Sequence, residues 1–151
     1  MREKRTIYLA YGSNLNILQM SRRCPDAKIL GRTVLADWKL TFCGGRGRAV
    51  ATIVPQKGCS VPVGLWSITA ADEQALDAYE GFPDLYRKED LRLMFDGKSV
   101  KAMVYIMNHS TVNLPSHVYF ITILKGYQDF DIQPEPLFTA LLEARENRFQ
   151  M

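Results

Sequence analysis

A long block without helical periodicity, between residues 27 and 68, constrains the fold more than any other feature of the sequence. Its four extended runs, K-I-L-G-R-T-V-L, W-K-L-T-F, A-V-A-T-I-V and V-P-V-G-L-W-S-I, are rich in β-branched residues and are bounded by glycine and proline, as strands are. Helices do not alternate regularly with these runs, which argues against a doubly wound parallel sheet. The order favours an α+β fold, in which a small mixed, mostly antiparallel sheet curls into a β-barrel flanked by helices.

Breaks in this block are expected at Ala36-Asp37, in the G-G-R-G-R loop at 44–48, and at a Pro-Gln-Lys-Gly turn at 55–58. Gly64, inside a strand, predicts a bulge or the close approach of another backbone. The remaining expected elements are a first strand at 5–10, a short helix at 15–23, a hairpin of Tyr86–Phe95 and Val100–Met107 turning at Asp96-Gly97, a helix from Ser116 to about Lys125, and a last helix at Leu137–Arg145.

The clearest helix signal covers Thr69 to Glu80. Thr69 can cap its first turn, and acidic residues follow in that turn, where the helix dipole favours negative charge. Gly81 can close the helix, and a proline follows two residues later.

Length and composition indicate a single domain over residues 1–151. The hydrophobic fraction of 47% and the charged fraction of 23% are ordinary for a globular protein. No apolar run approaches the ~20 residues that cross a bilayer, and the charged N-terminus does not resemble a signal peptide. The three cysteines form no C-x-x-C pair, which suggests free thiols in a reducing cytoplasm, and the net charge of +3 is too mild to indicate nucleic acid.

The stretch Ile7–Leu15, I-Y-L-A-Y-G-S-N-L, predicts a buried strand that breaks into a small polar loop and then a helix. Such a turn leaves backbone N–H groups free, and these can receive an anion or a carbonyl oxygen. A simple turn with a serine or asparagine helix cap explains the same residues, and this loop alone favours that simpler explanation.

Glu80 is the strongest single candidate for chemistry. It lies at the C-terminal end of its helix, where the dipole disfavours a negative charge, and apolar bulk surrounds it in L-D-A-Y-E-G-F-P. Both effects favour the neutral carboxyl group and make its carboxylate a better proton acceptor. The alternative is a solvated acidic face, because Glu73, Asp77 and Glu80 are spaced four and three residues apart.

Other candidates carry weaker signals. Ser13 lacks the G-x-S-x-G pattern of a nucleophilic serine, and Cys43 reads as a buried residue at a strand end. His109 and His117 match no metal-ligand spacing. Arg46 and Arg48 could contact phosphate, but a mobile surface loop is the favoured explanation for them. Tyr86 and Tyr119 stand at the starts of elements, where a phenol can reach a pocket.

Three segments together, Y-L-A-Y-G-S-N-L at 8–15, V-G-L-W at 63–66 and L-D-A-Y-E-G-F-P-D-L-Y at 76–86, resemble the γ-glutamylcyclotransferase family and its AIG2-like relatives. The resemblance runs from Ile7 to about Ala144. It implies a small barrel with a cavity at its mouth, Glu80 as the catalytic residue, and a set of substrate-binding residues. That set is Tyr8, Tyr11, Gly12, Ser13, Asn14, Tyr86 and Tyr119. The match at Tyr119 is the loosest, because the segment after it, F-I-T-I-L-K-G-Y-Q-D-F, departs from the small-residue pattern that usually follows the shared Gly126 in the family.

The resemblance also implies a reaction without metal or cofactor, in which a γ-glutamyl amide closes to 5-oxoproline and releases an amine. The partner expected is therefore a small γ-glutamyl substrate, with neither nucleic acid nor membrane, and a homodimer is left open. The alternative is a non-catalytic small-molecule- or partner-binding domain that retains the pocket. The released amine would extend towards the loops at 44–48 and 108–115.

Overall fold

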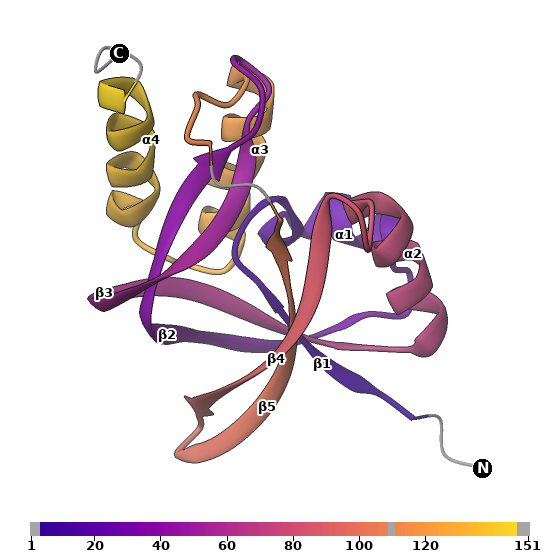
Figure 1. Ribbon diagram of the computed structural model, residues 1–151. Coiled ribbons are helices and arrows are strands. Elements are labelled where there is room, and N and C mark those ends of the chain that lie inside the picture. The colour runs from indigo at the N-terminus through magenta and orange to yellow at the C-terminus, as the bar shows by residue number, and fades with distance from the viewer. Residues whose placement is uncertain (1–3, 109–110, 148–151) are drawn as a thin grey trace.

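A long bent hairpin forms the largest part of the sheet (Figure 1), consisting of β2 (Lys28–Cys43) and β3 (Val50–Ile68). The computed structural model describes residues 4–108 and 111–147. The expected division of this hairpin into separate strands is wrong, since β2 continues through Ala36-Asp37 and β3 continues through 55–58. Asp37 and Gly58 both have positive φ, 65° and 88°, and the Gly58 N–H donates to Asp37 Oδ1 over 3.0 Å. The pairing skips residues 56–59 opposite Asp37 and resumes at Trp38 and Pro55, so both strands continue through an irregularity in the ladder.

The sheet has the strand order β2-β3-β1-β5-β4. The central strand β1 (Thr6–Ala10) is antiparallel to β3 and parallel to β5, so the sheet is mixed and mostly antiparallel. β4 (Tyr86–Phe95) and β5 (Lys98–Met107) form the hairpin expected from Asp96-Gly97, whose φ angles of 53° and 75° suit a tight turn.

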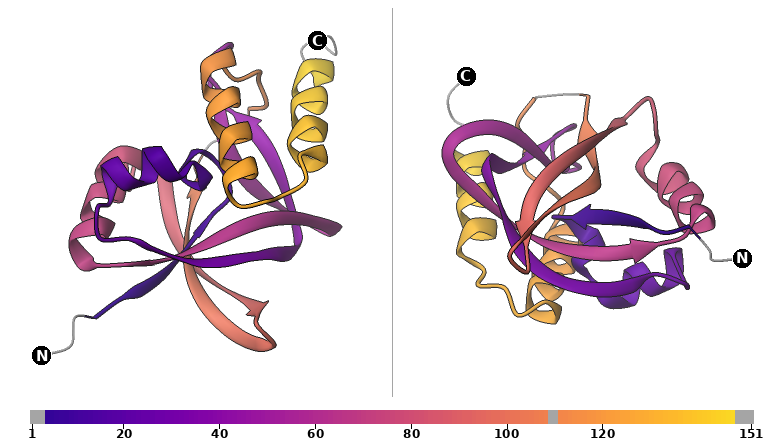
Figure 2. Two further views of the ribbon diagram at one scale, coloured as in Figure 1. Left: turned by 180° about the vertical axis from the view of Figure 1, so that it is seen from behind. Right: turned by 90° about the horizontal axis from the view of Figure 1, so that it is seen from below.

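The sheet curls strongly, and its two edge strands come together at one point (Figures 1 and 2). There the Thr33 hydroxyl on β2 donates to the Met94 carbonyl on β4 over 2.8 Å. No ladder joins β2 to β4 in residues 4–108, so the barrel is an open one. The predicted α+β fold with a curled sheet and flanking helices is confirmed in this looser form.

The helices form two pairs, α1 (Ile17–Arg23) with α2 (Ala70–Glu80), and α3 (His117–Asp129) with α4 (Glu135–Asn147) (Figure 2). The first pair lies beside β1 and the C-terminal part of β3, and the second pair lies against the tip of the β2–β3 hairpin. None of the helices within the described ranges is long and apolar enough to span a membrane.

Local signals account for the helix ends. The capping box between Thr69 and Asp72 starts α2, and Gly81 in the left-handed region, with φ of 67°, ends it, as predicted. The helix expected over 15–23 divides into a 3-10 turn at Ser13–Leu15 and then α1, because the Asn16 side chain accepts from the Gln19 N–H and starts a new helix.

Two glycines allow α3 and the sheet to pack directly on the 3-10 turn. A Cβ atom on Gly126 would lie 2.6 Å from the Asn16 nitrogen, and one on Gly64 would lie 2.7 Å from the Leu15 side chain and 2.6 Å from the Phe130 ring. The groups that approach Gly64 are the side chains of Leu15 and Phe130, and not the bulge or the second backbone that the sequence predicted there. These contacts press the Ser13–Leu15 turn between β3 and α3, which fixes the position of the loop that precedes it.

Candidate functional site

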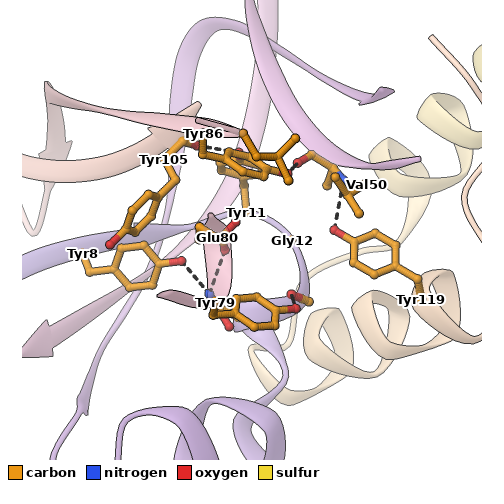
Figure 3. Close-up of a pocket in the computed structure, with 13 residues that line it drawn as sticks. Tyr8, Tyr11, Gly12, Val50, Tyr79, Glu80, Tyr86, Tyr105 and Tyr119 are labelled. Atoms are coloured by element: carbon orange, nitrogen blue, oxygen red, sulfur yellow. Dashed lines mark hydrogen bonds between the residues drawn. The ribbon is translucent and has the colours of Figure 1, made fainter. Parts of the chain in front are cut away.

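A cavity of about 210 Å³ opens between the end of β1, the end of α2 and the start of α3 (Figure 3). Six of the seven tyrosines in the sequence line it. All eight residues singled out from the sequence also line it, so the fold brings together positions that are up to 111 residues apart. Its lining is Tyr8, Tyr11, Gly12, Ser13, Asn14, Val50, Ala51, Tyr79, Glu80, Leu85, Tyr86, Tyr105 and Tyr119.

The loop after β1 forms one wall of the cavity. Its residues Ser13 and Asn14 are buried, with exposed fractions of 6% and 3%. The Trp66 indole N–H donates to the Asn14 carbonyl over 3.1 Å and pins the loop to β3. Gly12 lies where a Cβ atom would come within 3.2 Å of the Ala51 side chain, so a glycine lets the loop approach the opposite strand closely. A small, polar and rigid loop results.

Asn14 connects this loop to the carboxyl group of Glu80. Its side-chain NH₂ donates to the Tyr8 hydroxyl over 2.8 Å and lies 3.5 Å from Glu80 Oε1, a long contact (Figure 3). Its side-chain oxygen accepts from Arg23 over 2.7 Å. The amide of Asn14 is therefore fully engaged, with its donors turned into the cavity.

Glu80 does not belong to a uniformly solvated acidic face. Glu73 lies two turns and Asp77 one turn before it, and they pair with Lys88 at 2.7 and 3.1 Å. Glu80 itself is only partly exposed and turns into the cavity among the tyrosines (Figure 3). Burial raises the pKa of Glu80 from 4.5 to about 7, and the nearby Arg23 charge partly opposes this rise. At neutral pH this carboxyl group can both accept and release a proton.

The tyrosine hydroxyls on the opposite side of the cavity are held by backbone groups. Tyr86 donates to the Ala51 carbonyl over 2.6 Å, the Ala51 N–H donates to the Tyr119 hydroxyl over 2.9 Å, and Tyr11 donates to the Tyr105 carbonyl over 2.6 Å. Burial raises the pKa of each of the Tyr11, Tyr86 and Tyr119 phenols, so they stay neutral hydrogen-bonding groups.

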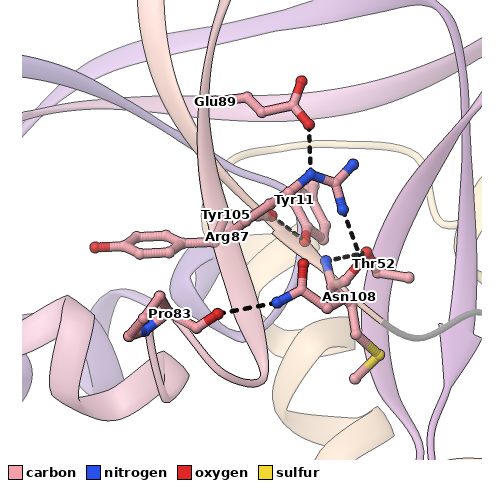
Figure 4. A network of polar contacts seen from close by, with 8 residues as sticks. Tyr11, Thr52, Pro83, Arg87, Glu89, Tyr105 and Asn108 are labelled. Atoms are coloured by element: carbon pink, nitrogen blue, oxygen red, sulfur yellow. Dashed lines mark hydrogen bonds and ion pairs between the residues drawn. The ribbon is translucent and has the colours of Figure 1, made fainter.

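A polar network behind the cavity holds the segment that follows Glu80 (Figure 4). The Asn108 side chain donates to the Pro83 carbonyl over 2.9 Å, and the Met107 N–H donates to the Thr52 hydroxyl over 3.0 Å. Arg87 donates to the Met107 carbonyl and pairs with Glu89. The end of β5 is thereby tied both to β3 and to the turn after α2, which restrains the helix end that carries Glu80.

Three residues around the cavity were not singled out as site residues from the sequence. Tyr79 precedes Glu80 directly, and its hydroxyl lies 3.0 Å from Ser13 Oγ. Tyr105 packs edge-to-face against Tyr8. Arg23 stacks on the Tyr79 ring, 3.6 Å from its centroid. The sequence signal that Tyr79 and Tyr105 share is only that they are tyrosines, the residue type that dominates the lining of this cavity.

The weaker candidates occupy other environments. Cys43 is buried at the end of β2, and burial raises the pKa of its thiol. His117 is exposed at the start of α3, and His109 lies outside the described residues. Residues 4–108 and 111–147 contain no cluster of three or more His, Cys, Asp or Glu side chains that could hold a metal ion. Ser13 contacts a phenol, which is a poor general base.

The structure is thus a curled α+β sheet with one partly buried acid inside a tyrosine-lined cavity. The sequence model of the family described as "Gamma-glutamyl cyclotransferase, AIG2-like" matches residues 8–121. The chain belongs to this family.

Individual relatives agree with this assignment. The human protein named gamma-glutamylcyclotransferase is 27% identical over 136 residues, which cover 84% of this chain and 72% of the human one. The mouse protein of the same name is 27% identical over 138 residues, covering 85% of this chain and 73% of its own. A solved structure titled "Gamma-glutamyl cyclotransferase" superposes with a TM-score of 0.81 at 24% identity, covering 91% of this chain and 86% of its own, and shares the fold.

Proposed function

We propose that this protein is a γ-glutamyl cyclotransferase, which converts a γ-glutamyl amide into 5-oxoproline and a free amine or amino acid, with Glu80 as the general acid and base. The observation that carries the proposal is the Glu80 carboxyl group, which faces the same small cavity as the Y-G-S-N loop. Family membership supports the reaction class, and the pKa of about 7 supports the proton-transfer role.

The chemistry needs little beyond orientation and one proton shuttle. The α-amine of the γ-glutamyl group attacks its own γ-carbonyl carbon, a C–N bond forms, and a five-membered ring closes. Holding the γ-glutamyl group of the substrate in the bent conformation needed for ring closure can lower the activation barrier by ~7 kcal/mol or more. At neutral pH the α-amine is mostly an ammonium group and cannot attack until a base removes its proton.

Glu80 performs both proton transfers in this proposal. Its carboxylate takes the proton from the ammonium group, and the amine adds to the carbonyl. The protonated carboxyl group then gives its proton to the departing nitrogen as the amide bond breaks, and the ring nitrogen passes its second proton to the released amine, which leaves as an ammonium ion. The lactam and the carboxylate are thus obtained without water entering the reaction. Such general acid–base catalysis contributes roughly 10²- to 10⁴-fold to the rate when the pKa lies near the working pH.

The other cavity residues bind the substrate. The N–H groups at Gly12–Asn14 hold the substrate and can stabilise the oxyanion of the tetrahedral intermediate. Ser13 is a binding residue in this scheme, because the substrate brings its own nucleophile. Tyr8, Tyr11, Tyr86 and Tyr119 enclose the glutamyl group with neutral phenols. A cavity of about 210 Å³ suits a glutamyl group and leaves the amine portion at the mouth.

The loops proposed to meet the amine portion are joined to one another. The Gly44 N–H donates to the Thr111 carbonyl over 2.9 Å, and the Asn113 side chain donates to the Gly44 carbonyl over 2.6 Å. The cavity residues Val50 and Ala51 come two and three residues after the first loop. Substitutions in this joined pair of loops should therefore change the preference for the amine while leaving the cyclisation itself in place.

The test is the identity of the products from a panel of γ-glutamyl amides that differ in the amine. We expect equal amounts of 5-oxoproline and amine from at least one member. Glutamate in place of 5-oxoproline would mean hydrolysis and would contradict the mechanism. Tight binding with no product from any member would favour a non-catalytic binding domain.

A further inference from the structure

Arg23, the last residue of α1, contacts both walls of the cavity without lining it. One guanidinium nitrogen, Nη1, donates to Asn14 Oδ1 over 2.7 Å, and Nη2 donates to Gln19 Oε1. The face of the guanidinium lies 3.6 Å from the centroid of the Tyr79 ring. A single planar cation therefore touches the loop after β1 and the end of α2 at once.

The contact with Asn14 sets the direction of its amide. Because Oδ1 accepts from Arg23, the NH₂ group must face the Tyr8 hydroxyl and Glu80 Oε1. In the opposite orientation, the Asn14 oxygen would face the carboxylate of Glu80, and two acceptors would oppose each other. Arg23 thus selects the orientation in which Asn14 can donate to the carboxyl group.

The contact with Tyr79 fixes the other wall. Tyr79 is 44% exposed and directly precedes Glu80, so little apart from its contacts holds its ring in place. The guanidinium covers the ring, and the Tyr79 hydroxyl meets Ser13 Oγ at 3.0 Å. A cation over an aromatic face is worth about 0.5–2 kcal/mol, which is enough to favour one side-chain position.

Arg23 also supplies the positive charge near the site. The titratable groups that face the Glu80 carboxyl group from the elements around it are the guanidinium of Arg23 and the phenols of Tyr8, Tyr11, Tyr79, Tyr86, Tyr105 and Tyr119. The guanidinium of Arg23 brings the positive charge to this set, whose other members are tyrosine hydroxyls. It favours the carboxylate form, which burial disfavours.

We propose that Arg23 is the positioning residue of this site, holding the Asn14 amide and the Tyr79 ring so that Glu80 meets the substrate ammonium group in one orientation. The proposal rests on the proposed function, since it assigns a role within that reaction. It distinguishes Arg23 from its neighbour Arg22, which is exposed on the same turn of α1.

The experiment compares Arg23→Met, Arg23→Lys and the control Arg22→Met. For each we would measure kcat and KM for 5-oxoproline release and the Glu80 titration by NMR on ¹³C-labelled glutamate. Arg23→Met should lower kcat roughly 10- to 100-fold, as expected for a misplaced catalytic group, with little change in KM. Its Glu80 titration should move to higher pH.

Arg23→Lys separates charge from geometry. Lysine keeps the charge but lacks the planar fork, so the titration of Glu80 should return close to that of the wild type while kcat recovers only in part. Arg22→Met should match the wild type in every measurement. If Arg23→Met does not fold, Arg23→Lys decides alone: reduced kcat with an unchanged titration supports the proposal, and wild-type kcat overturns it.

Two results for Arg23→Met would overturn the proposal. The first is kcat and a Glu80 titration that both match Arg22→Met. The second is a fall in kcat with an unmoved titration, which would indicate a general structural role. A wild-type protein that releases no 5-oxoproline from any γ-glutamyl amide would refute the proposed function instead, and the titration would still test the contact between Arg23 and Glu80.

Discussion

Replacing Glu80 by glutamine should alter how the stability of the protein depends on pH. The pKa of Glu80 is raised by burial from 4.5 to about 7 in the folded protein, whereas in the unfolded chain it returns to its ordinary value. The folded state therefore holds the proton more tightly, and folding is penalised once the unfolded chain has released it. Since one pKa unit corresponds to about 1.4 kcal/mol, the full penalty is about 3 kcal/mol.

The sign of the effect follows from this linkage. Below pH 4.5 the carboxyl group is protonated in both states, so wild type and Glu80→Gln should differ by a constant offset only. As the pH rises through 4.5 towards 7, the wild type should lose stability relative to the variant. Above about pH 8 the difference should be constant again.

Urea unfolding at several pH values between 4 and 8.5 measures this difference directly. Comparing the two proteins at each pH cancels the titration of all other groups to first order. Glu146→Gln, on the exposed end of α4, which contributes nothing to the cavity lining, is the control and should follow the wild type throughout. A difference between wild type and Glu80→Gln that does not change with pH would refute the reasoning that burial shifts this carboxyl group.

Three further substitutions test the packing and the hydrogen bonds that shape the site. Gly126→Ala should destabilise the fold by about 1–3 kcal/mol in urea unfolding, because the new Cβ atom would meet backbone atoms at 2.6 Å, whereas Gly45→Ala meets only a flexible side chain and should have little effect. Tyr119→Phe leaves the buried N–H of Ala51 without its 2.9 Å partner and should cost about 1–2 kcal/mol by the same measurement. Thr69→Ala removes the capping hydroxyl of α2 and should lower the thermal midpoint by an amount equivalent to about 1 kcal/mol; an unchanged midpoint would mean that the capping box contributes nothing.

Local signals explain which parts of the fold could be predicted. The start and end of α2 depend on a capping threonine and a left-handed glycine, and both are readable because they act within a few residues. The hairpin at Asp96-Gly97 is readable for the same reason. The continuity of β2 and β3 through Asp37 and Gly58 could not be predicted, because in the sequence these residues resemble chain reversals. Only the pairing of the two strands on either side shows that both strands continue there.

The residues of the site likewise include some that could be predicted from the sequence and some that could not. The residues of the Y-G-S-N loop and Glu80 could be predicted because each lies in a short motif, although no local rule says that they share one cavity. Arg23 could not be distinguished from Arg22, since both end the same helix and only the position of Asn14 and Tyr79 in space separates them. Tyr105 was missed because a tyrosine in a strand usually serves packing, and its place beside Tyr8 depends on the pairing of β1 with β5.

The proton-transfer role of Glu80 is tested most directly by the rate of 5-oxoproline release from the best γ-glutamyl amide by wild type, Glu80→Gln and the control Glu146→Gln. Glutamine is nearly isosteric with glutamate but cannot take up the ammonium proton. Glu80→Gln should therefore lower kcat roughly 10²- to 10⁴-fold while Glu146→Gln leaves it unchanged. Release of 5-oxoproline by Glu80→Gln at the wild-type rate would contradict the assignment of Glu80 as the general acid and base.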